Sequence, residues 1–163
     1  MSDAAKVALV TGGNRGIGLA IAKELAAQGV KVIIGHRSGS APSGFESVLI
    51  DVSDTKSVDS AVSEIDAKYG GVDILVANAG ITKDGLVMRM SDDDFESVVN
   101  TNLTGAFRVA RATSKNMMKK TVLMILLLFA ITVYPNNQID DENYNEIKNK
   151  ISQFGNIFVE DEA

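Results

Sequence analysis

The sequence predicts an α/β fold of three layers, in which a doubly wound parallel sheet of about six strands lies between helices. Short β-branched runs alternate with segments of helical spacing through the first 120 residues, and the strand runs are almost continuously apolar. A strand that is apolar on both faces has to be covered on both faces, as in a parallel sheet between two layers of helices.

Four strands are expected in the first 120 residues. The runs are "KVALV" (6–10), "VKVIIGH" (30–36), "SVLIDV" (47–52) and "VDILVANAG" (72–80). Each is short and rich in Val, Ile or Leu, which is typical of a buried strand. Most of the sheet is therefore expected to come from this part of the chain.

Helices are expected between these strands. "IGLAIAKELAAQ" (17–28) ends before Gly29, and "SVDSAVSEIDAKYG" (57–70) has a similar spacing of apolar residues. Residues three or four apart share one face of a helix, so each segment has an apolar face to place on the sheet. "SGSAPSG" (38–44) stands where another crossover helix would be expected, and its composition predicts a loop.

A longer helix is expected over residues 92–120. Ser91 precedes it as a suitable N-cap, and Asp94 follows three residues later as a weak capping box.

Residues 121–163 differ in composition and are expected to add a strand–helix–strand unit to the same domain. They hold six asparagines against five in residues 1–120, and the expected elements are a long strand at 121–133, a helix at 140–154 and a strand at 156–161. The apolar run "TVLMILLLFAITV" is shorter than the ~20 residues that a membrane span needs. Read from Met118, it also has the layout of a secretory leader, although an internal position argues against that function.

Composition and charge exclude several classes of function. The chain has no cysteine and one histidine, His36, which argues against disulfides and against a metal site. Residues 1–120 carry equal numbers of acidic and basic side chains, so the net charge of −5 arises in residues 121–163. No basic stripe indicates nucleic acid, and the N-terminal "MSDAAK" lacks a leader pattern. We expect a cytoplasmic protein that binds neither nucleic acid nor a membrane.

Three glycines mark the turn between the first strand and the first helix. Gly12, Gly16 and Gly18 lie where the backbone N–H groups and the positive end of the helix dipole are free. A diphosphate bound there needs close approach to the backbone, which side chains would prevent. The position between a strand and a helix favours a dinucleotide site over a tight turn whose glycines serve packing alone.

The spacing T-G-x-x-x-G-x-G at 11–18, together with "NAG" at 78–80, resembles the short-chain dehydrogenase/reductase family. "VALVTGGNRGIGLAIAKELA", "HRSGSAP", "DVSD", "VDILVANAGITKDGLVMRM" and "NTNLTGAFRVARATSKNMM" are similar to bacterial 3-oxoacyl-(acyl carrier protein) reductases of the mycobacterial type. The resemblance covers about residues 5–120. It implies a Rossmann-type domain of which residues 1–120 form the NADP-binding half, while residues 121–163 do not match the family.

The resemblance implies a cofactor site along the carboxyl ends of the strands. The first turn would hold the phosphates with Gly12, Asn14, Arg15, Gly16, Ile17 and Gly18. Asp51 and Val52 would meet the adenine, unless Asp51 is only a turn former. Asn78, Ala79 and Gly80 would hold the ribose on the nicotinamide side.

Arg37 follows the second strand, where a carboxylate would select the free ribose hydroxyl of NAD. An arginine there favours a 2′-phosphate, so NADP(H) is the expected cofactor. The alternative is that Arg37 is a solvated charge in a loop. His36 beside it is interpreted as a bystander.

Three residues are catalytic candidates under the resemblance. Asn102 matches the asparagine that holds open a helix and anchors a water for proton relay, with Asn100 as the competing candidate. Tyr144 and Lys148 have the i, i+4 spacing of a proton donor and the lysine that lowers its pKa, on the helix expected after the fifth strand. A chance pairing in a tail of this composition is the alternative.

The resemblance also implies features that this sequence lacks. No serine follows the expected fifth strand before Tyr144, and Thr132 is the nearest hydroxyl. The family continues for about another hundred residues with interface helices and a substrate lid, so the fold is expected to be truncated and its oligomeric state stays open. The expected function is NADPH-dependent reduction of a 3-oxoacyl thioester, carried by an acyl carrier protein. The alternatives are an inactive Rossmann module that at most binds NADP(H), and a chimera without function.

Overall fold

The computed structural model describes residues 5–119, 124–127, 145 and 149, and these form a three-layer α/β structure. Five parallel strands make one sheet in the order β3-β2-β1-β4-β5. The strands are β1 (Val7–Thr11), β2 (Lys31–His36), β3 (Glu46–Leu49), β4 (Ile74–Ala77) and β5 (Met124–Leu127). The prediction of a doubly wound parallel sheet is therefore confirmed.

The strand order reverses direction between β1 and β4. From β1 the chain moves outward to β2 and β3, then crosses back to place β4 on the other side of β1. In sheets of this kind ligands bind outside the carboxyl ends of the strands at such a reversal. The carboxyl ends of β1 and β4 are therefore the place to look for a site.

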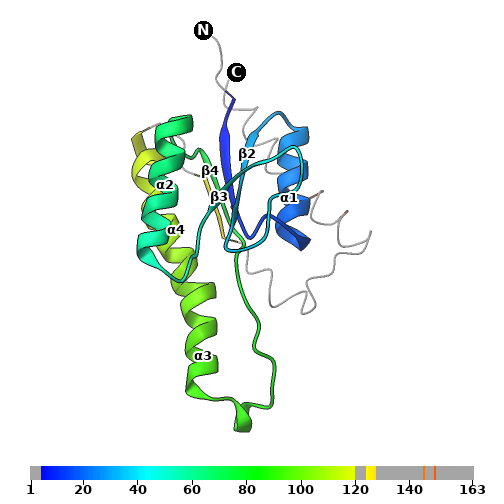
Figure 1. Ribbon diagram of the computed structural model, residues 1–163, viewed down its shortest axis with the longest axis vertical. Coiled ribbons are helices and arrows are strands. Elements are labelled where there is room, and N and C mark those ends of the chain that lie inside the picture. The colour runs from blue at the N-terminus through cyan, green and yellow to red at the C-terminus, as the bar shows by residue number, and fades with distance from the viewer. Residues whose placement is uncertain (1–4, 120–123, 128–144, 146–148, 150–163) are drawn as a thin grey trace.

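Helices cover both faces of the sheet. Figure 1 shows α1 (Gly16–Ala27) on one side and α2 (Thr55–Tyr69) with α4 (Gly105–Lys119) on the other. Alternate residues of β1 face the two layers: Val7 and Leu9 pack with α2 and α4, whereas Ala8 and Val10 pack with α1. Since both sets are buried, β1 is apolar throughout, which explains the continuous apolar runs in the sequence.

The helix ends confirm the boundaries predicted at Gly29 and Ser91, and the structure adds a cap at Asp54 that was not predicted. Asp54 caps α2 by accepting from Lys56 N, and Gly70 ends that helix at φ 77°. Gly29 closes the first helix at φ 83°. Ser91 caps α3 (Asp92–Val98), where its hydroxyl accepts from Asp94 N. Such caps satisfy backbone groups that the first and last turns leave free.

The helix expected over 92–120 is interrupted. After α3 the chain makes a π-helix over Val99–Thr104 and continues as α4 to Lys119. Spacing of apolar residues cannot predict this change, because one π-turn alters the register by a single residue. In Figure 1 the α3 end of this long segment extends beyond the end of the sheet, next to the chain that follows β4.

Beyond residue 119 the structure tests only part of the expectations. Met124–Leu127 form β5, which pairs in parallel with β4 at the edge of the sheet, within the strand expected at 121–133. Asn145 and Asn149 are helical and exposed, in the helix expected at 140–154. The strand expected at 156–161, along with Thr132, Tyr144 and Lys148, lies outside the described residues. In the ranges that are described, no helix is long and apolar enough to cross a membrane.

Candidate functional site

The site begins at the turn between β1 and α1, which is held against the neighbouring strand. Gly12 has φ 66°, a conformation that residues with a Cβ rarely adopt, and its N–H donates to Gly35 O of β2 at 2.7 Å. A Cβ on Gly12 would also lie 3.1 Å from Ala79 Cα. The turn therefore requires glycine both for its conformation and for its contact with the chain after β4.

Gly18 allows the first turn of α1 to lie directly on this loop. A Cβ at Gly18 would come within 2.5 Å of both Gly12 O and Asn78 Nδ2. Gly16, at φ 54°, begins the helix. These glycines therefore do allow close packing, which was the alternative interpretation of the turn. The close packing places the N-terminus of α1 at the carboxyl end of β1.

The N-terminus of α1 has no side-chain cap. Its N-cap residue is the exposed Arg15, whose side chain makes no capping hydrogen bond, and the first turn holds no acidic residue. In contrast, α2 and α3 are capped by Asp54 and Ser91. Free N–H groups, the positive helix end and a nearby guanidinium together suit a bound anion such as a diphosphate.

Thr11 and Asn78 join the ends of β1 and β4. The amide of Asn78 donates from Nδ2 to Thr11 O at 3.1 Å and to Gly12 O at 3.3 Å. In return, Thr11 Oγ1 accepts from the backbone N–H groups of Asn78 and Ala79, both at 3.1 Å. Sequence reasoning missed Thr11 as a site residue, although its place before the glycines, at the end of an apolar strand, was a usable signal.

Asn14 and Ile17, expected near the phosphates, and Gly80, expected at the ribose on the nicotinamide side, lie on the same edge of the sheet. Asn14 donates from Nδ2 to Ser38 O in the loop after β2, at 3.4 Å. Ile17 is buried on the core side of α1, so only its backbone is available to a ligand. Gly80 is exposed after β4.

Arg37 and Asp51 follow the adjacent strands β2 and β3. Arg37 is exposed, whereas Asp51 is half-buried and accepts from Ser53 N at 2.9 Å and Ser53 Oγ at 2.6 Å through Oδ1. The Ser53 hydroxyl is the main cause that lowers the pKa of Asp51, and the positive charge of Arg37 lowers it further. The structure therefore brings a cation and a carboxylate together at the carboxyl ends of β2 and β3.

Val52 and His36 are buried. The Val52 side chain packs against α4, where a Cβ on Gly105 would lie 2.8 Å from Val52 Cγ2. Its backbone therefore offers more to a ligand than its side chain does. His36 is only 7% exposed, and within the part of the chain that the structure describes its Nδ1 has no hydrogen-bond partner.

The two candidate asparagines of the π-helix have different partners. The side-chain amide of Asn102 forms two hydrogen bonds with the backbone of Ile81. It accepts from the Ile81 N–H and donates to the Ile81 carbonyl, both at 2.9 Å. Asn100 instead accepts from Arg108 Nη2 at 2.8 Å. Asn102 thus reaches the segment that directly follows Asn78, Ala79 and Gly80, while Asn100 does not.

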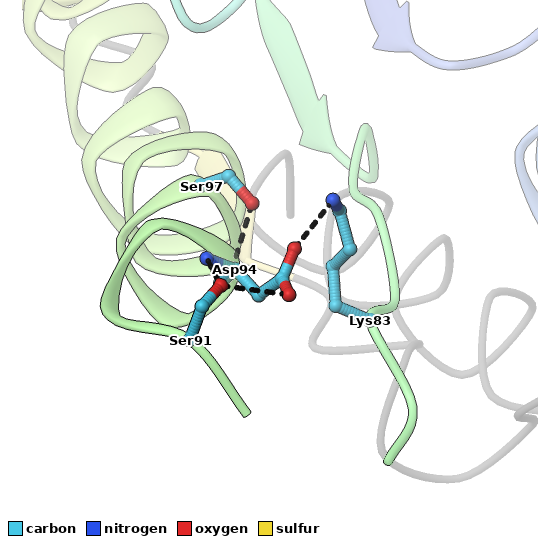
Figure 2. A network of polar contacts seen from close by, with 4 residues as sticks. All are labelled: Lys83, Ser91, Asp94 and Ser97. Atoms are coloured by element: carbon cyan, nitrogen blue, oxygen red, sulfur yellow. Dashed lines mark hydrogen bonds and ion pairs between the residues drawn. The ribbon is translucent and has the colours of Figure 1, made fainter. Parts of the chain in front are cut away.

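A polar network ties the chain after β4 to α3 (Figure 2). Lys83 Nζ lies 2.7 Å from Asp94 Oδ1, and Ser91 Oγ donates to Asp94 Oδ2 at 2.9 Å. Ser97 donates to the Asp94 carbonyl. Lys83 and Ser91 lower the pKa of Asp94, so the carboxylate stays ionised at neutral pH and holds the two segments together.

The described residues therefore define an α/β protein of the Rossmann type. Its glycine turn, the N-terminus of α1 and the reversal of strand order lie together at one edge of the sheet. The family model for short chain dehydrogenases matches residues 6–128, and the chain belongs to this family. The match extends past residue 120 and includes β5.

Named relatives and a solved structure agree with this assignment. The 3-oxoacyl-[acyl-carrier-protein] reductase MabA of Mycobacterium avium is 48% identical over 124 residues, 76% of this chain and 49% of that protein. The 3-oxoacyl-[acyl-carrier-protein] reductase FabG of Salmonella typhimurium is 41% identical over 139 residues, 80% of this chain and 57% of that protein. A gluconate 5-dehydrogenase from Burkholderia cenocepacia J2315, solved in complex with NADP and tartrate, aligns with a TM-score of 0.67 at 32% identity, covering 74% of this chain and 51% of that one. The chain spans about half the length of the curated relatives it matches.

Proposed function

We propose that this chain binds NADP(H) as the cofactor half of a reductase that converts a 3-oxoacyl thioester to the hydroxyacyl thioester in fatty acid synthesis. The observation that carries the proposal is the edge formed by the glycine turn, the uncapped N-terminus of α1 and Arg37. That edge combines free N–H donors with cations, as a dinucleotide that carries three phosphates requires.

The residues present fit this cofactor. Phosphate oxygens would accept from the N–H groups around Gly16 and Ile17, beside Asn14 and Arg15. Arg37 would pair with the 2′-phosphate, and Asp51 would accept from the adenine amino group. Asn78, Ala79 and Gly80 lie toward the nicotinamide side, where Asn102 fixes the next residue, Ile81. When bound in its reduced form, the dinucleotide supplies the hydride for the ketone carbon.

The ketone oxygen also needs a proton, for which Tyr144 and Lys148 are our proposed pair. A tyrosine hydroxyl has an unperturbed pKa of about 10, so a donor near neutral pH needs a neighbouring cation. Lys148 stands four residues later and would share a helix face with Tyr144.

The substrate proposal rests on the reductases to which the chain is similar. Both MabA and FabG are named 3-oxoacyl-[acyl-carrier-protein] reductases, at 48% and 41% identity. We therefore propose an acyl carrier protein as the partner that presents the thioester, in the cytoplasm.

One observation favours a second candidate, a Rossmann module that binds NADP(H) without turnover. The sequence has no serine between Ser114 and Ser152, so no serine precedes Tyr144 on or after the strand β5 to orient a carbonyl. This candidate retains the cofactor site unchanged.

Calorimetric titration of the full chain with NADPH, and separately with NADH, tests the shared cofactor proposal. Micromolar NADPH binding with much weaker NADH binding is the expected result, and absence of binding to either would overturn both candidates. NADPH oxidation with an acetoacetyl thioester then separates them: a reductase turns over and loses activity in Tyr144→Phe, whereas the binding module shows no turnover and binds NADPH equally well in that variant.

A further inference from the structure

Arg108 joins three segments that are far apart in the sequence. It lies in the first turn of α4 and is half-buried. The helices α4 and α2 pack side by side (Figure 1). Its guanidinium donates to the loop after β3, to the start of α2 and to the π-helix. None of the site assignments made from the sequence or the fold includes this residue.

On the adenine side, Arg108 holds the loop that follows Asp51. Nε donates to Thr55 Oγ1 at 3.2 Å, and Nη1 donates to Val52 O at 3.3 Å. Because Val52 comes directly after Asp51, this contact bears on the backbone that would receive the adenine.

On the other side, Arg108 holds the π-helix. Nη1 donates to Asn100 O at 3.2 Å and Nη2 donates to Asn100 Oδ1 at 2.8 Å. Asn100 O also accepts from the N–H of Gly105, which is the five-residue step of a π-turn. The guanidinium thus supports the carbonyl on which this π-turn depends.

The π-helix in turn places Asn102. Two residues after Asn100, Asn102 pairs through both atoms of its amide with Ile81. Hydrogen bonds therefore link Val52 to Arg108, Arg108 to Asn100, and Asn102 to Ile81, and the backbone of the π-helix joins Asn100 to Asn102. These links join the adenine side of the proposed cofactor site to its nicotinamide side.

We propose that Arg108 is a positioning residue that couples these two sides, so that a ligand seated at Asp51 and Val52 alters the hold of Asn102 on Ile81. The proposal rests on the proposed function for the location of the adenine. A planar guanidinium suits the role because its donors have a fixed fork geometry and can bind several acceptors at once.

The test uses adenosine 2′,5′-bisphosphate, which occupies the adenine side only, and follows backbone amide resonances by NMR in the full chain. In the wild type we expect the amides of both Val52 and Ile81 to shift on titration. In Arg108→Met the Val52 shift should remain and the Ile81 shift should be lost. Arg111→Met, which removes an exposed arginine from the same helix, is the matched control and should behave as the wild type.

Two results would overturn the proposal while leaving cofactor binding intact. One is an Ile81 shift in Arg108→Met equal to that in the wild type, and the other is a Val52 shift in the wild type without any Ile81 shift. If Arg108→Met does not fold, Thr55→Val removes one acceptor of the guanidinium and should weaken the Ile81 response.

A measurement without ligand separates failure of this inference from failure of the proposed function. If the bisphosphate shifts no amide in the wild type, the adenine site is wrong, and hydrogen exchange of the Ile81 amide then decides the role of Arg108. Exchange about tenfold faster in Arg108→Met than in Arg111→Met would support positioning, since the amide is released when Asn102 moves. Equal exchange in the two variants would overturn it.

Discussion

Thr11 shows how one side chain can hold the site at the residue scale. Thr11 is 1% exposed. Its hydroxyl accepts from two backbone N–H groups after β4, and its carbonyl accepts from the side-chain amide of Asn78. A buried N–H group without an acceptor is expensive, because it has lost its water without replacement. The end of β4 is therefore held in place by a residue of β1.

Thr11→Val should destabilise the protein by about 1–3 kcal/mol, because the N–H of Ala79 loses its acceptor, whereas the N–H of Asn78 keeps Val76 O at 3.1 Å. Thr113→Val is the matched control. Thr113 is equally buried, with 1% of its surface exposed, but its hydroxyl donates to Val109 O within its own helix. Removing this hydroxyl therefore leaves no N–H group without an acceptor. Urea denaturation of both variants gives the comparison, and equal losses would contradict this explanation.

Gly18→Ala should weaken both folding and cofactor binding. The new methyl group would lie 2.5 Å from Gly12 O, and backbone cannot move away as easily as the end of a flexible side chain. We expect a loss of about 1–3 kcal/mol in unfolding free energy, accompanied by weaker NADPH binding in a calorimetric titration. Gly85→Ala is the control, since its Cβ would meet nothing within 4 Å. Unchanged stability in Gly18→Ala would show that the turn relaxes.

Arg37→Asp should reverse the cofactor preference. The variant loses the cation for a 2′-phosphate and gains a carboxylate that repels it, so NADPH affinity should fall about 10- to 100-fold, the range of a charged hydrogen bond. NADH binding should hold or improve, because a carboxylate can accept from the free ribose hydroxyl. Arg89→Asp, on the exposed turn Val87–Arg89, controls for the change in net charge. An NADPH affinity equal to that of the control would make Arg37 a solvated loop charge.

At the scale of elements, a cluster of charged side chains links strand β3 to its neighbours β2 and α2. Glu46 of β3 meets Lys31 of β2 at 3.4 Å and Lys68 of α2 at 3.0 Å. Lys68 is the main cause that lowers the pKa of Glu46 to about 2, with contributions from Tyr69 and Lys31. The cluster joins two strands and a helix at the border of the sheet.

The contribution of Glu46 to stability should depend on pH. Its pKa in the folded protein is about 2, below the ordinary value of 4.5, so the ionised form is favoured by folding. The contribution is therefore complete above pH 4.5 and is lost as the pH falls toward 2. The free-energy difference between the wild type and Glu46→Gln should shrink as the pH falls from 4.5 toward about 2 in urea denaturation. The exposed Glu64→Gln on α2 serves as control, and a difference independent of pH would contradict the cluster's role.

At the scale of the whole molecule, a bound ligand would raise the free energy of unfolding. The proposed site takes residues from the ends of β1, β2, β3 and β4, none of which are close together in an unfolded chain. A ligand that binds only the folded state stabilises it by about 2.7 kcal/mol at a concentration of 100 times its Kd. We expect NADPH to raise the urea midpoint accordingly, and NADH to do so far less at equal concentration. Equal effects of the two would argue against recognition of the 2′-phosphate.

The sequence by itself determined the fold class and much of the proposed site. Apolar runs of strand length, helical spacing, Gly29 after the first helix and the cap at Ser91 are local properties, and they predicted the parallel sheet and the helices that cover it. The glycine spacing predicted the turn because a positive φ and a close backbone contact exclude a Cβ whatever the surroundings.

Only the tertiary structure decided which side chains are joined across the site. The roles of Thr11 and Asn102 depend on partners 68 and 21 residues away in the sequence, and Arg108 joins Asn100, 8 residues away, to Thr55, 53 residues away. No local pattern reveals these pairings. The π-helix also depends on tertiary contacts. Asn100 and Asn102 hold it through hydrogen bonds to Arg108 and Ile81, and the helix propensity of its own residues does not predict it. Local spacing predicts the elements, whereas the pairing of polar groups between elements emerges only when the folded chain brings them together.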